Sequence, residues 1–285
     1  MKATKRNFFG MLCILFVVIA AWHAPVAAGE GPVHWYDSVE EASTAARRGN
    51  RPMMIDFWAT WCAACRVMES DVYSSKEFVA ATSRLFPVRI DYDKKAALAR
   101  KYNVQSLPTI VFTDSYGNEL FRYSGYIGSK PLLELVRALP ADVSEFNRLN
   151  GVLASDKNNI EALEGMGRNL RTAGLFRASN DYYAKALDRP EARADAPKRE
   201  AILTEMGMNA LDVKEGKQAA GIFEKCLKEF PTSTRKPAWM LGLGQAYATG
   251  EKKDKIKARK VLEALTRENV SSEISGKALE LLKAL

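Results

Sequence analysis

Histidine and cysteine are scarce in this chain of 285 residues, which contains two His and four Cys. Four cysteines are too few for a fold that disulfides hold together. Lys and Arg number 42 against 34 Asp and Glu, and this net charge of +8 forms no basic stripe of the kind that nucleic-acid binding needs. With 18 Gly, 11 Pro and 47% hydrophobic residues, collagen-like, low-complexity and disordered chains are excluded. The length predicts about two globular domains, and we expect no nucleic-acid partner.

Long apolar runs are also absent, except for one near the N-terminus. This run spans residues 8–21, follows three basic residues, and precedes small residues at 24–28 that fit a cleavage site. We therefore expect a cleaved signal peptide at residues 1–28 and an exported, periplasmic protein that makes no membrane contact after cleavage. An uncleaved membrane anchor is the alternative, although the run is shorter than the ~20 residues of a spanning helix.

Residues 29–140 alternate between strand-like and helix-like segments. Short apolar or alternating runs predict strands, and helical periodicity with capping residues predicts helices. A sheet covered by helices is the simplest arrangement for this order, so we predict one α/β domain over residues 29–140. The predicted strands are 53–58, 85–90, 109–113 and 119–124, and the predicted helices are 38–48, 62–70, 94–102 and 129–139.

Residues 141–285 show only helical spacing, and part of the pattern repeats. Gly167 and Gly207 are 40 residues apart, and so are Tyr183 and Phe223. A third copy follows, and a proline comes after the second helix of the first two. This pattern resembles the tetratricopeptide repeat, whose period is about 34 residues. The resemblance implies a stack of helix pairs that binds a peptide or helix, and a non-repeating helical bundle is the alternative.

Two cysteines, Cys62 and Cys65, lie two residues apart between a predicted buried strand and a predicted helix. The positive end of a helix stabilises a thiolate, so we predict that Cys62 attacks a substrate disulfide and Cys65 resolves the mixed disulfide. Half of a zinc site is one alternative, but His34 and Cys226 are the only further Cys or His residues after position 28. A purely structural disulfide is the other. We expect no metal and no cofactor.

These cysteines belong to a set of motifs that resembles a known family. The segment DFWATWCAAC at residues 56–65 is followed by Leu-Pro-Thr at 107–109 and by Gly125. In order and spacing the set is similar to thioredoxin, over about residues 33–140. The resemblance implies a thioredoxin fold with a cis proline, Pro108, facing the cysteines. The substrate-binding residues that it implies are Trp61, Leu107 and Thr109.

The same resemblance gives a role to Asp56, which matches the buried acid beneath the resolving cysteine of thioredoxins. A carboxylate in an apolar strand has a raised pKa, so Asp56 can accept the proton of Cys65 as the mixed disulfide resolves. Arg89 falls near the position of the basic partner of this acid. A charge pair between Asp56 and Arg89, with no part in catalysis, is the alternative.

Two departures from thioredoxin indicate a narrower group. Two alanines separate the cysteines in place of the Gly-Pro of thioredoxin. Ser70 stands where thioredoxin has the proline that kinks the helix beginning at the cysteines. Together with Glu69 and the segment 103–110, they resemble the C-terminal thioredoxin-like domain of DsbD-type periplasmic disulfide reductases. In that group, acids at the positions of Asp56 and Glu69 tune the cysteines. The alternative for Glu69 is an ordinary exposed helix residue.

The sequence therefore predicts a thiol–disulfide oxidoreductase with a helical repeat domain. We expect it to reduce, or to relay electrons to, protein disulfides, for instance in cytochrome c maturation. Its partners would be a disulfide-bonded protein substrate and a redox partner protein. The alternative is a binding protein in which the repeats dominate and the thioredoxin fold is a platform.

Overall fold

The computed structural model of the protein describes residues 32–268 and 270–285. The predicted signal peptide, residues 1–28, lies outside these ranges. No helix within them is long and apolar enough to cross a membrane.

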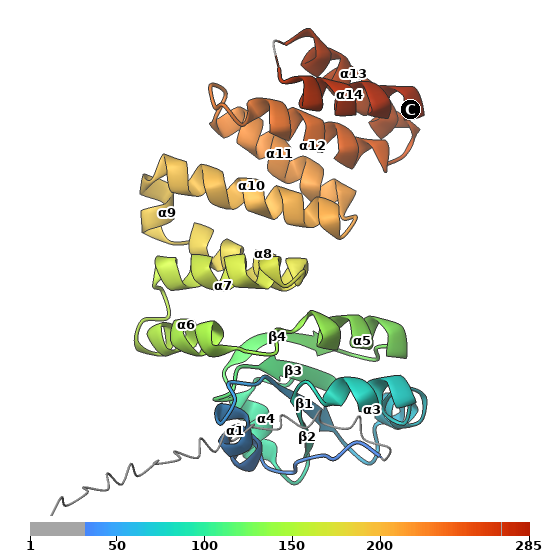
Figure 1. Cartoon of the computed structure of the whole chain (residues 1–285), viewed down its shortest axis with the longest axis vertical. Helices are drawn as coiled ribbons and strands as arrows, with labels where there is room; N and C mark the ends of the chain where they lie inside the picture. The colour runs from blue at the N-terminus through green and yellow to red at the C-terminus, as the bar shows by residue number, and fades with distance from the viewer. Residues whose placement is uncertain (1–31, 269) are drawn as a thin grey trace, which may run out of the picture.

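A four-stranded mixed sheet forms the centre of the first part of the chain (Figure 1). The strands are β1 Met53–Trp58, β2 Phe86–Asp91, β3 Thr109–Thr113 and β4 Glu119–Ser124, each within one residue of its predicted position. Their order is β2-β1-β3-β4, with β1 parallel to β2 and antiparallel to β3, and β3 antiparallel to β4. The central strand β1 is buried along almost its whole length, as its sequence, apolar at every position except Asp56, predicts.

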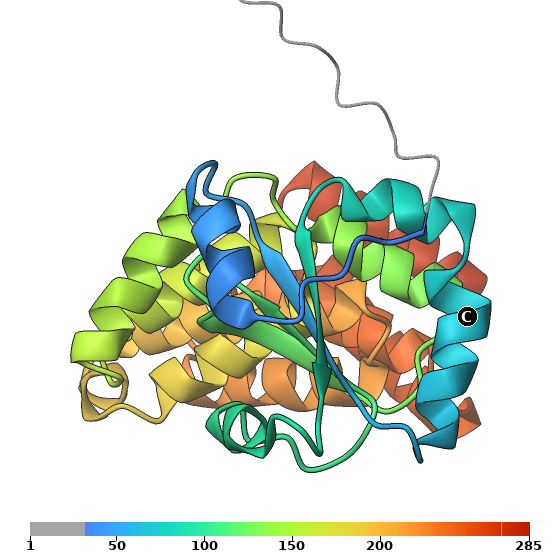
Figure 2. The same cartoon turned by 90° about the horizontal axis from the view of Figure 1, so that it is seen from below.

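Helices cover both faces of this sheet, as Figure 2 shows. They are α1 Val39–Arg47, α2 Ala63–Met68, a π-helix η1 Glu69–Tyr73, α3 Lys76–Thr82, α4 Ala96–Lys101 and α5 Ser129–Ala138. Helices α1 and α4 pack on one face, in a core that includes Phe57 and Ala99. Helices α2, α3 and α5 pack on the other face, in a core that includes Met54 and Leu132. The cysteines therefore lie on the second face.

The prediction of one regular helix over 62–70 is wrong at its C-terminal end. Helix α2 ends at Met68, and the chain continues as a π-helix in which the Ser74 N–H bonds the Glu69 carbonyl, five residues back, at 3.3 Å. The extra residue in this turn widens the helix beside the cysteines. The next helix, α3, begins after its cap Ser75 and is not predicted by periodicity, because seven residues complete only two turns.

After α5 the described residues form helices only, arranged as an elongated stack that leads away from the sheet (Figure 1). They are α6 Ser144–Ser155, α7 Ile160–Thr172, α8 Phe176–Leu187, α9 Pro190–Ala194, α10 Ala196–Asp212, α11 Gly216–Glu229, α12 Lys236–Ala248, α13 Lys252–Arg267 and α14 Ser272–Ala284. Neighbouring helices of the chain pack on one another, so the stack is built from antiparallel pairs.

The 40-residue spacing of the sequence corresponds to a repeated contact in this stack. Gly167 in α7 faces the ring of Tyr183 in α8, and Gly207 in α10 faces the ring of Phe223 in α11. A Cβ atom on either glycine would lie 2.7 Å from the ring, so the ring packs directly on the helix backbone. In the third copy Gly244 of α12 faces Leu262 of α13, so a leucine takes the place of the ring. The spacing thus corresponds to a glycine that packs against a side chain of the next helix, and the tetratricopeptide repeat itself stays a prediction.

The helical region is joined to the sheet by a packed core. Only residues 139–143 separate α5 from α6, and both Leu139 and Val143 are buried. One continuous apolar cluster extends from Met54 in β1 to Ile202 in α10. The boundary that we predict between the two domains falls within this connection, and it stays a prediction.

Hydrogen bonds reinforce the same junction. The Asn150 side chain of α6 donates to the buried Asp114 carboxylate, which follows β3, at 2.8 Å. The Tyr182 hydroxyl of α8 donates to the Glu119 carbonyl at the start of β4, at 3.1 Å. Two helices of the stack are thus fixed to the turn that joins β3 and β4.

Candidate active site

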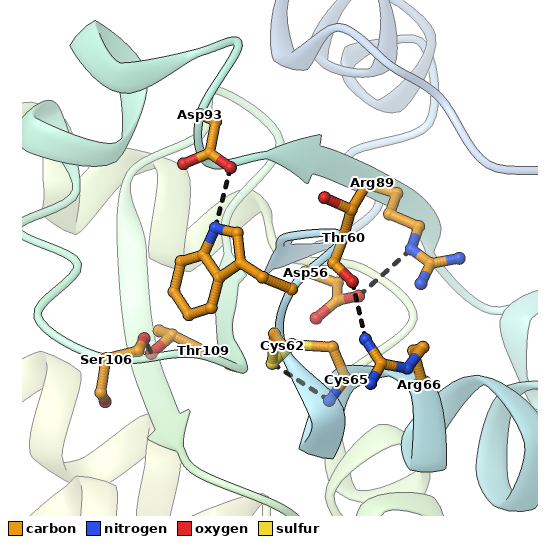
Figure 3. Close-up of a disulfide and its surroundings, with 10 residues drawn as sticks. Asp56, Thr60, Cys62, Cys65, Arg66, Arg89, Asp93, Ser106 and Thr109 are labelled. Carbon is orange, nitrogen blue, oxygen red and sulfur yellow. Dashed lines mark hydrogen bonds and ion pairs between the residues drawn. A yellow bond between two sulfur atoms is a disulfide. The ribbon is translucent and has the colours of Figure 1, made fainter.

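The two cysteines form a disulfide at the start of α2 (Figure 3). Cys62 is the N-cap residue of α2, and its Sγ accepts the backbone N–H of Cys65 at 3.1 Å. Such N–H groups stabilise the thiolate form of an N-cap cysteine. Both cysteines are buried, Cys62 at 5% and Cys65 at 2% exposure. Within the described ranges, no group of three or more His, Cys, Asp and Glu side chains could hold a metal ion.

Asp56 lies in β1, on the sheet face that α2 covers, and its side chain is 2% exposed. Figure 3 shows its carboxylate between the Arg89 guanidinium and the disulfide. Asp56 and Arg89 are register partners on the parallel strands β1 and β2, and 3.6 Å separates Asp56 Oδ2 from Arg89 Nε. Burial raises the pKa of Asp56 from its ordinary value of 3.8 to about 7, and the charge of Arg89 opposes the rise. This carboxyl can therefore gain or lose a proton near neutral pH.

Arg89 also binds the second predicted acid, Glu69, to which its Nη1 donates a hydrogen bond. The guanidinium carbon lies 4.5, 5.7 and 5.9 Å from the ring centres of Trp58, Trp35 and Tyr73, within cation–π distance. The Glu69 side chain is 50% exposed and forms an ion pair with this mostly buried arginine, and its role at the cysteines stays a prediction. Sequence reasoning missed Trp35 and Tyr73, because only the folded chain brings these distant residues to one arginine.

The predicted substrate surface surrounds a cis-proline loop. The Leu107–Pro108 peptide bond is cis, and the Pro108 carbonyl accepts the Gly125 N–H at 2.8 Å. Trp61 is 63% exposed, and its indole N–H donates to Asp93 at 2.9 Å. Leu107 is partly buried against the two cysteines. An exposed indole and an apolar loop therefore flank the disulfide.

Thr109 does not present its side chain on this surface. It is 1% exposed, and its hydroxyl donates to the Ser106 carbonyl at 2.8 Å, which fixes the loop from inside. The substrate contact at Thr109 stays a prediction, and with the side chain buried it would be made by the backbone. Two further aromatic residues, Tyr123 in β4 and Tyr126 just after it, are exposed.

Comparisons with known proteins agree with this geometry. The family model for the thioredoxin-like domain matches residues 39–140. Residues 39–140 form a thioredoxin-like domain. A similar curated protein is the thiol:disulfide interchange protein DsbD of Yersinia pestis (strain Pestoides F), 31% identical over 102 residues, which cover 34% of this chain and 17% of that protein. The protein of the same name from Cronobacter sakazakii is 29% identical over 131 residues, which cover 42% of this chain and 22% of that protein.

The chain thus spans less than a quarter of the length of these relatives. Among solved structures, one titled DsbH Oxidoreductase matches with a TM-score of 0.35 and 24% identity over 38% of this chain and 84% of that chain. Thioredoxin of Fasciola hepatica matches with a TM-score of 0.30 and 25% identity over 35% and 92%. The predicted fold class, a thioredoxin-like α/β domain followed by an all-α region, is confirmed. With its CxxC pair, the thioredoxin-like domain is of the thiol–disulfide oxidoreductase type.

Proposed function

We propose that the whole protein is an exported thiol–disulfide oxidoreductase that reduces, or relays electrons to, disulfides of other proteins through Cys62 and Cys65. The observation that carries the proposal is the cysteine pair at the start of α2, next to the buried carboxyl of Asp56. A platform without redox chemistry needs neither the pair nor an acid that titrates near neutral pH.

The proposed reaction begins with both cysteines reduced. The Cys62 thiolate attacks one sulfur of the substrate disulfide, forms a mixed disulfide and releases the other substrate sulfur as a thiolate. Asp56 then takes the proton of the Cys65 thiol, and the resulting thiolate attacks Cys62 Sγ. The second substrate thiolate leaves, so the substrate has gained two electrons and the Cys62–Cys65 disulfide has formed. A redox partner protein that carries a dithiol returns the pair to its reduced state.

Serine substitutions test this order of events. We expect Cys62→Ser to abolish the acceleration that the protein gives to the reduction of insulin disulfides by dithiothreitol. We expect Cys65→Ser to accumulate mixed disulfides with substrate, visible on a non-reducing gel. Cys226→Ser is the control, because this thiol is buried in the helical region and far from the site in sequence. Mixed disulfides trapped by Cys62→Ser and not by Cys65→Ser would reverse the two roles.

Export is the second element of the proposal. It is supported by the predicted signal peptide at residues 1–28, and by the likeness of residues 39–140 to DsbD-type domains. We propose a periplasmic location, with cytochrome c maturation as one process that needs such a reductase. N-terminal sequencing of protein from a periplasmic extract should begin at Gly29. A start at Met1 in the membrane fraction would favour the uncleaved anchor.

For the helical region we propose a role in binding a peptide or helix of a partner. An open groove of about 580 Å³ lies between α7, α8 and α10, and both acidic and basic side chains line it. The charged residues of the groove are Glu164, Arg168, Arg171, Glu205 and Asp212. A groove with charges of both signs suits a partner segment of mixed charge. The test compares the effects of two variants on cells that lack the native protein. If Cys62→Ser restored the function of the protein in these cells and a variant with reversed charges in the groove did not, the alternative of a binding protein with the thioredoxin fold as a platform would be favoured.

A further inference from the structure

Three buried polar atoms near the disulfide lack a hydrogen-bond partner: Asp56 Oδ1, the Tyr73 hydroxyl and Arg89 Nε. The arginine atom is compensated by charge, because it lies 3.6 Å from the other oxygen of Asp56. The tyrosine hydroxyl has no such compensation, and an unpaired buried hydroxyl is costly. A phenylalanine would fill the same apolar space without this cost. The hydroxyl of Tyr73 therefore needs an explanation that the proposed reaction has not used.

The π-helix sets the position of Tyr73. In a regular helix each residue adds about 100° of rotation, so the extra residue of the turn Glu69–Tyr73 changes the direction of the side chain that ends it. Tyr73 is 2% exposed, and its ring packs edge-on against Trp35 with 5.0 Å between ring centres. Trp35 belongs to the segment before α1, which is held along β2 because the Arg89 N–H donates to the Tyr36 carbonyl at 2.8 Å. The tyrosine ring is therefore fixed from two sides.

The Tyr73 hydroxyl is a buried donor without a partner and Asp56 Oδ1 is a buried acceptor without one. Both residues lie around Arg89, whose guanidinium carbon is 5.9 Å from the centre of the Tyr73 ring and whose Nε is 3.6 Å from Asp56 Oδ2. Burial raises the pKa of Asp56 and the charge of Glu69 adds to the rise, whereas the charge of Arg89 and the Tyr73 hydroxyl lower it. Burial and the charge of Asp56 raise the pKa of Tyr73 well above its ordinary value of 10, so the hydroxyl keeps its proton and can act as a donor. In the disulfide form neither the Tyr73 hydroxyl nor Asp56 Oδ1 has a hydrogen-bond partner.

We propose that Tyr73 is a positioning residue for Asp56: its hydroxyl donates a hydrogen bond to the carboxylate and holds it ionised to receive the Cys65 proton. The π-helix and the contact with Trp35 position this donor. The catalytic role of Tyr73 rests on the proposed function, because it requires Asp56 to take the Cys65 proton. Tyr73 touches neither substrate nor sulfur in this scheme, and it acts only through Asp56.

The experiment compares two Tyr→Phe variants, each of which removes only the hydroxyl oxygen of a buried tyrosine, by their effect on the titration of Asp56. Tyr73→Phe removes the proposed donor, and Tyr102→Phe is the matched control, because the Tyr102 hydroxyl donates to the Gly117 carbonyl on the opposite face of the sheet. The full-length oxidised protein is labelled with ¹³C at its carboxyl groups and titrated by NMR. The signal of Asp56 is identified by its loss in Asp56→Asn.

We expect Tyr73→Phe to raise the Asp56 midpoint by about half a unit to one unit, and Tyr102→Phe to leave it unchanged. A rise of about one unit from a midpoint near 7 lowers the ionised fraction at pH 7 about five-fold. Resolution of the mixed disulfide should slow by the same factor at pH 7 and recover above pH 8.5. Trp35→Phe, which loosens the packing of Tyr73, should shift the midpoint less and in the same direction.

An Asp56 midpoint that is the same in Tyr73→Phe and in the unmodified protein would overturn the proposal. Equal shifts in Tyr73→Phe and Tyr102→Phe would also overturn it, because they would report a general loosening of the core. Failure of the proposed function is a separate result: Cys62→Ser would then retain disulfide-exchange activity, while the NMR midpoints would still report whether Tyr73 acts on Asp56.

Discussion

Replacing Asp56 with Asn should stabilise the folded protein above neutral pH and have little effect in acid. The folded chain holds this carboxyl at a pKa of about 7, against an ordinary value of 3.8, mainly because it is buried. One pKa unit corresponds to about 1.4 kcal/mol, so ionising Asp56 costs the folded state about 4 kcal/mol. The cost is absent below about pH 4, where the carboxyl is protonated whether the chain is folded or not. It grows as the pH rises toward 7, and it is complete above 7.

The assay is urea unfolding of the oxidised protein and of Asp56→Asn at a series of pH values from 4 to 8. Any cost of burying the Asn amide is the same at every pH, so it cancels from the trend. We expect the free energy of unfolding of the variant, relative to the unmodified protein, to increase by about 4 kcal/mol across this range.

Asp114 provides the matched control, because it is a second buried aspartate in the same domain. Its carboxylate accepts hydrogen bonds from the backbone N–H groups of Tyr116 and Asn118 and from the side chains of Asn118 and Asn150. Asp114→Asn places an NH₂ group against these donors and should destabilise the protein by about 1–3 kcal/mol. Parallel stability curves for Asp56→Asn and the unmodified protein between pH 4 and 8 would refute the reasoning about Asp56.

Three further predictions follow from the packing. Gly207→Ala should destabilise the protein by about 1–3 kcal/mol, because its Cβ would lie 2.7 Å from the Phe223 ring; Gly221→Ala, where nothing lies within 4 Å, should not, and equal unfolding midpoints for both would contradict this. Burial raises the pKa of the Cys226 thiol to about 12, so iodoacetamide at pH 8 should label it in urea but not in the native protein; rapid native labelling would count against a closed core. A fragment of residues 29–140 should fold and reduce a small disulfide, but with a lower Tm than the full chain by calorimetry, because truncation uncovers the shared core; an unchanged Tm would show that the junction contributes nothing.

The sequence was sufficient for the elements and motifs that depend on local pattern. The strand at 53–58 could be predicted because all but one of its residues are apolar, and the helix at 38–48 because a hydroxyl residue precedes an amphipathic run. Asp56 stands out for the same reason, as a single acid within an apolar strand. The cysteine pair is recognised by its spacing, and its place at the start of α2 follows from the strand before it.

The remaining features depend on contacts between distant parts of the chain. The π-helix needs one extra residue in a turn, and residues 69–73 carry no signal that separates it from an α-helix. The inward direction of Thr109 depends on a hydrogen bond that only the folded loop can form. The junction between the two regions is equally hidden, because Phe121 and Leu149 belong to one cluster although they lie in segments that look like separate units in the sequence.

The packed junction has a consequence for how a captured partner would reach the disulfide. A flexible linker lets a bound molecule sample many orientations, and its effective concentration at a second site falls as the linker lengthens. Here α6 and α8 are bonded to the turn between β3 and β4, so a segment held between α7, α8 and α10 would keep a fixed distance from Cys62. Only a disulfide at the matching distance along the partner could then be presented to the sulfur. The protein would then select substrates by the distance between the bound segment and the disulfide, as well as by the affinity for that segment.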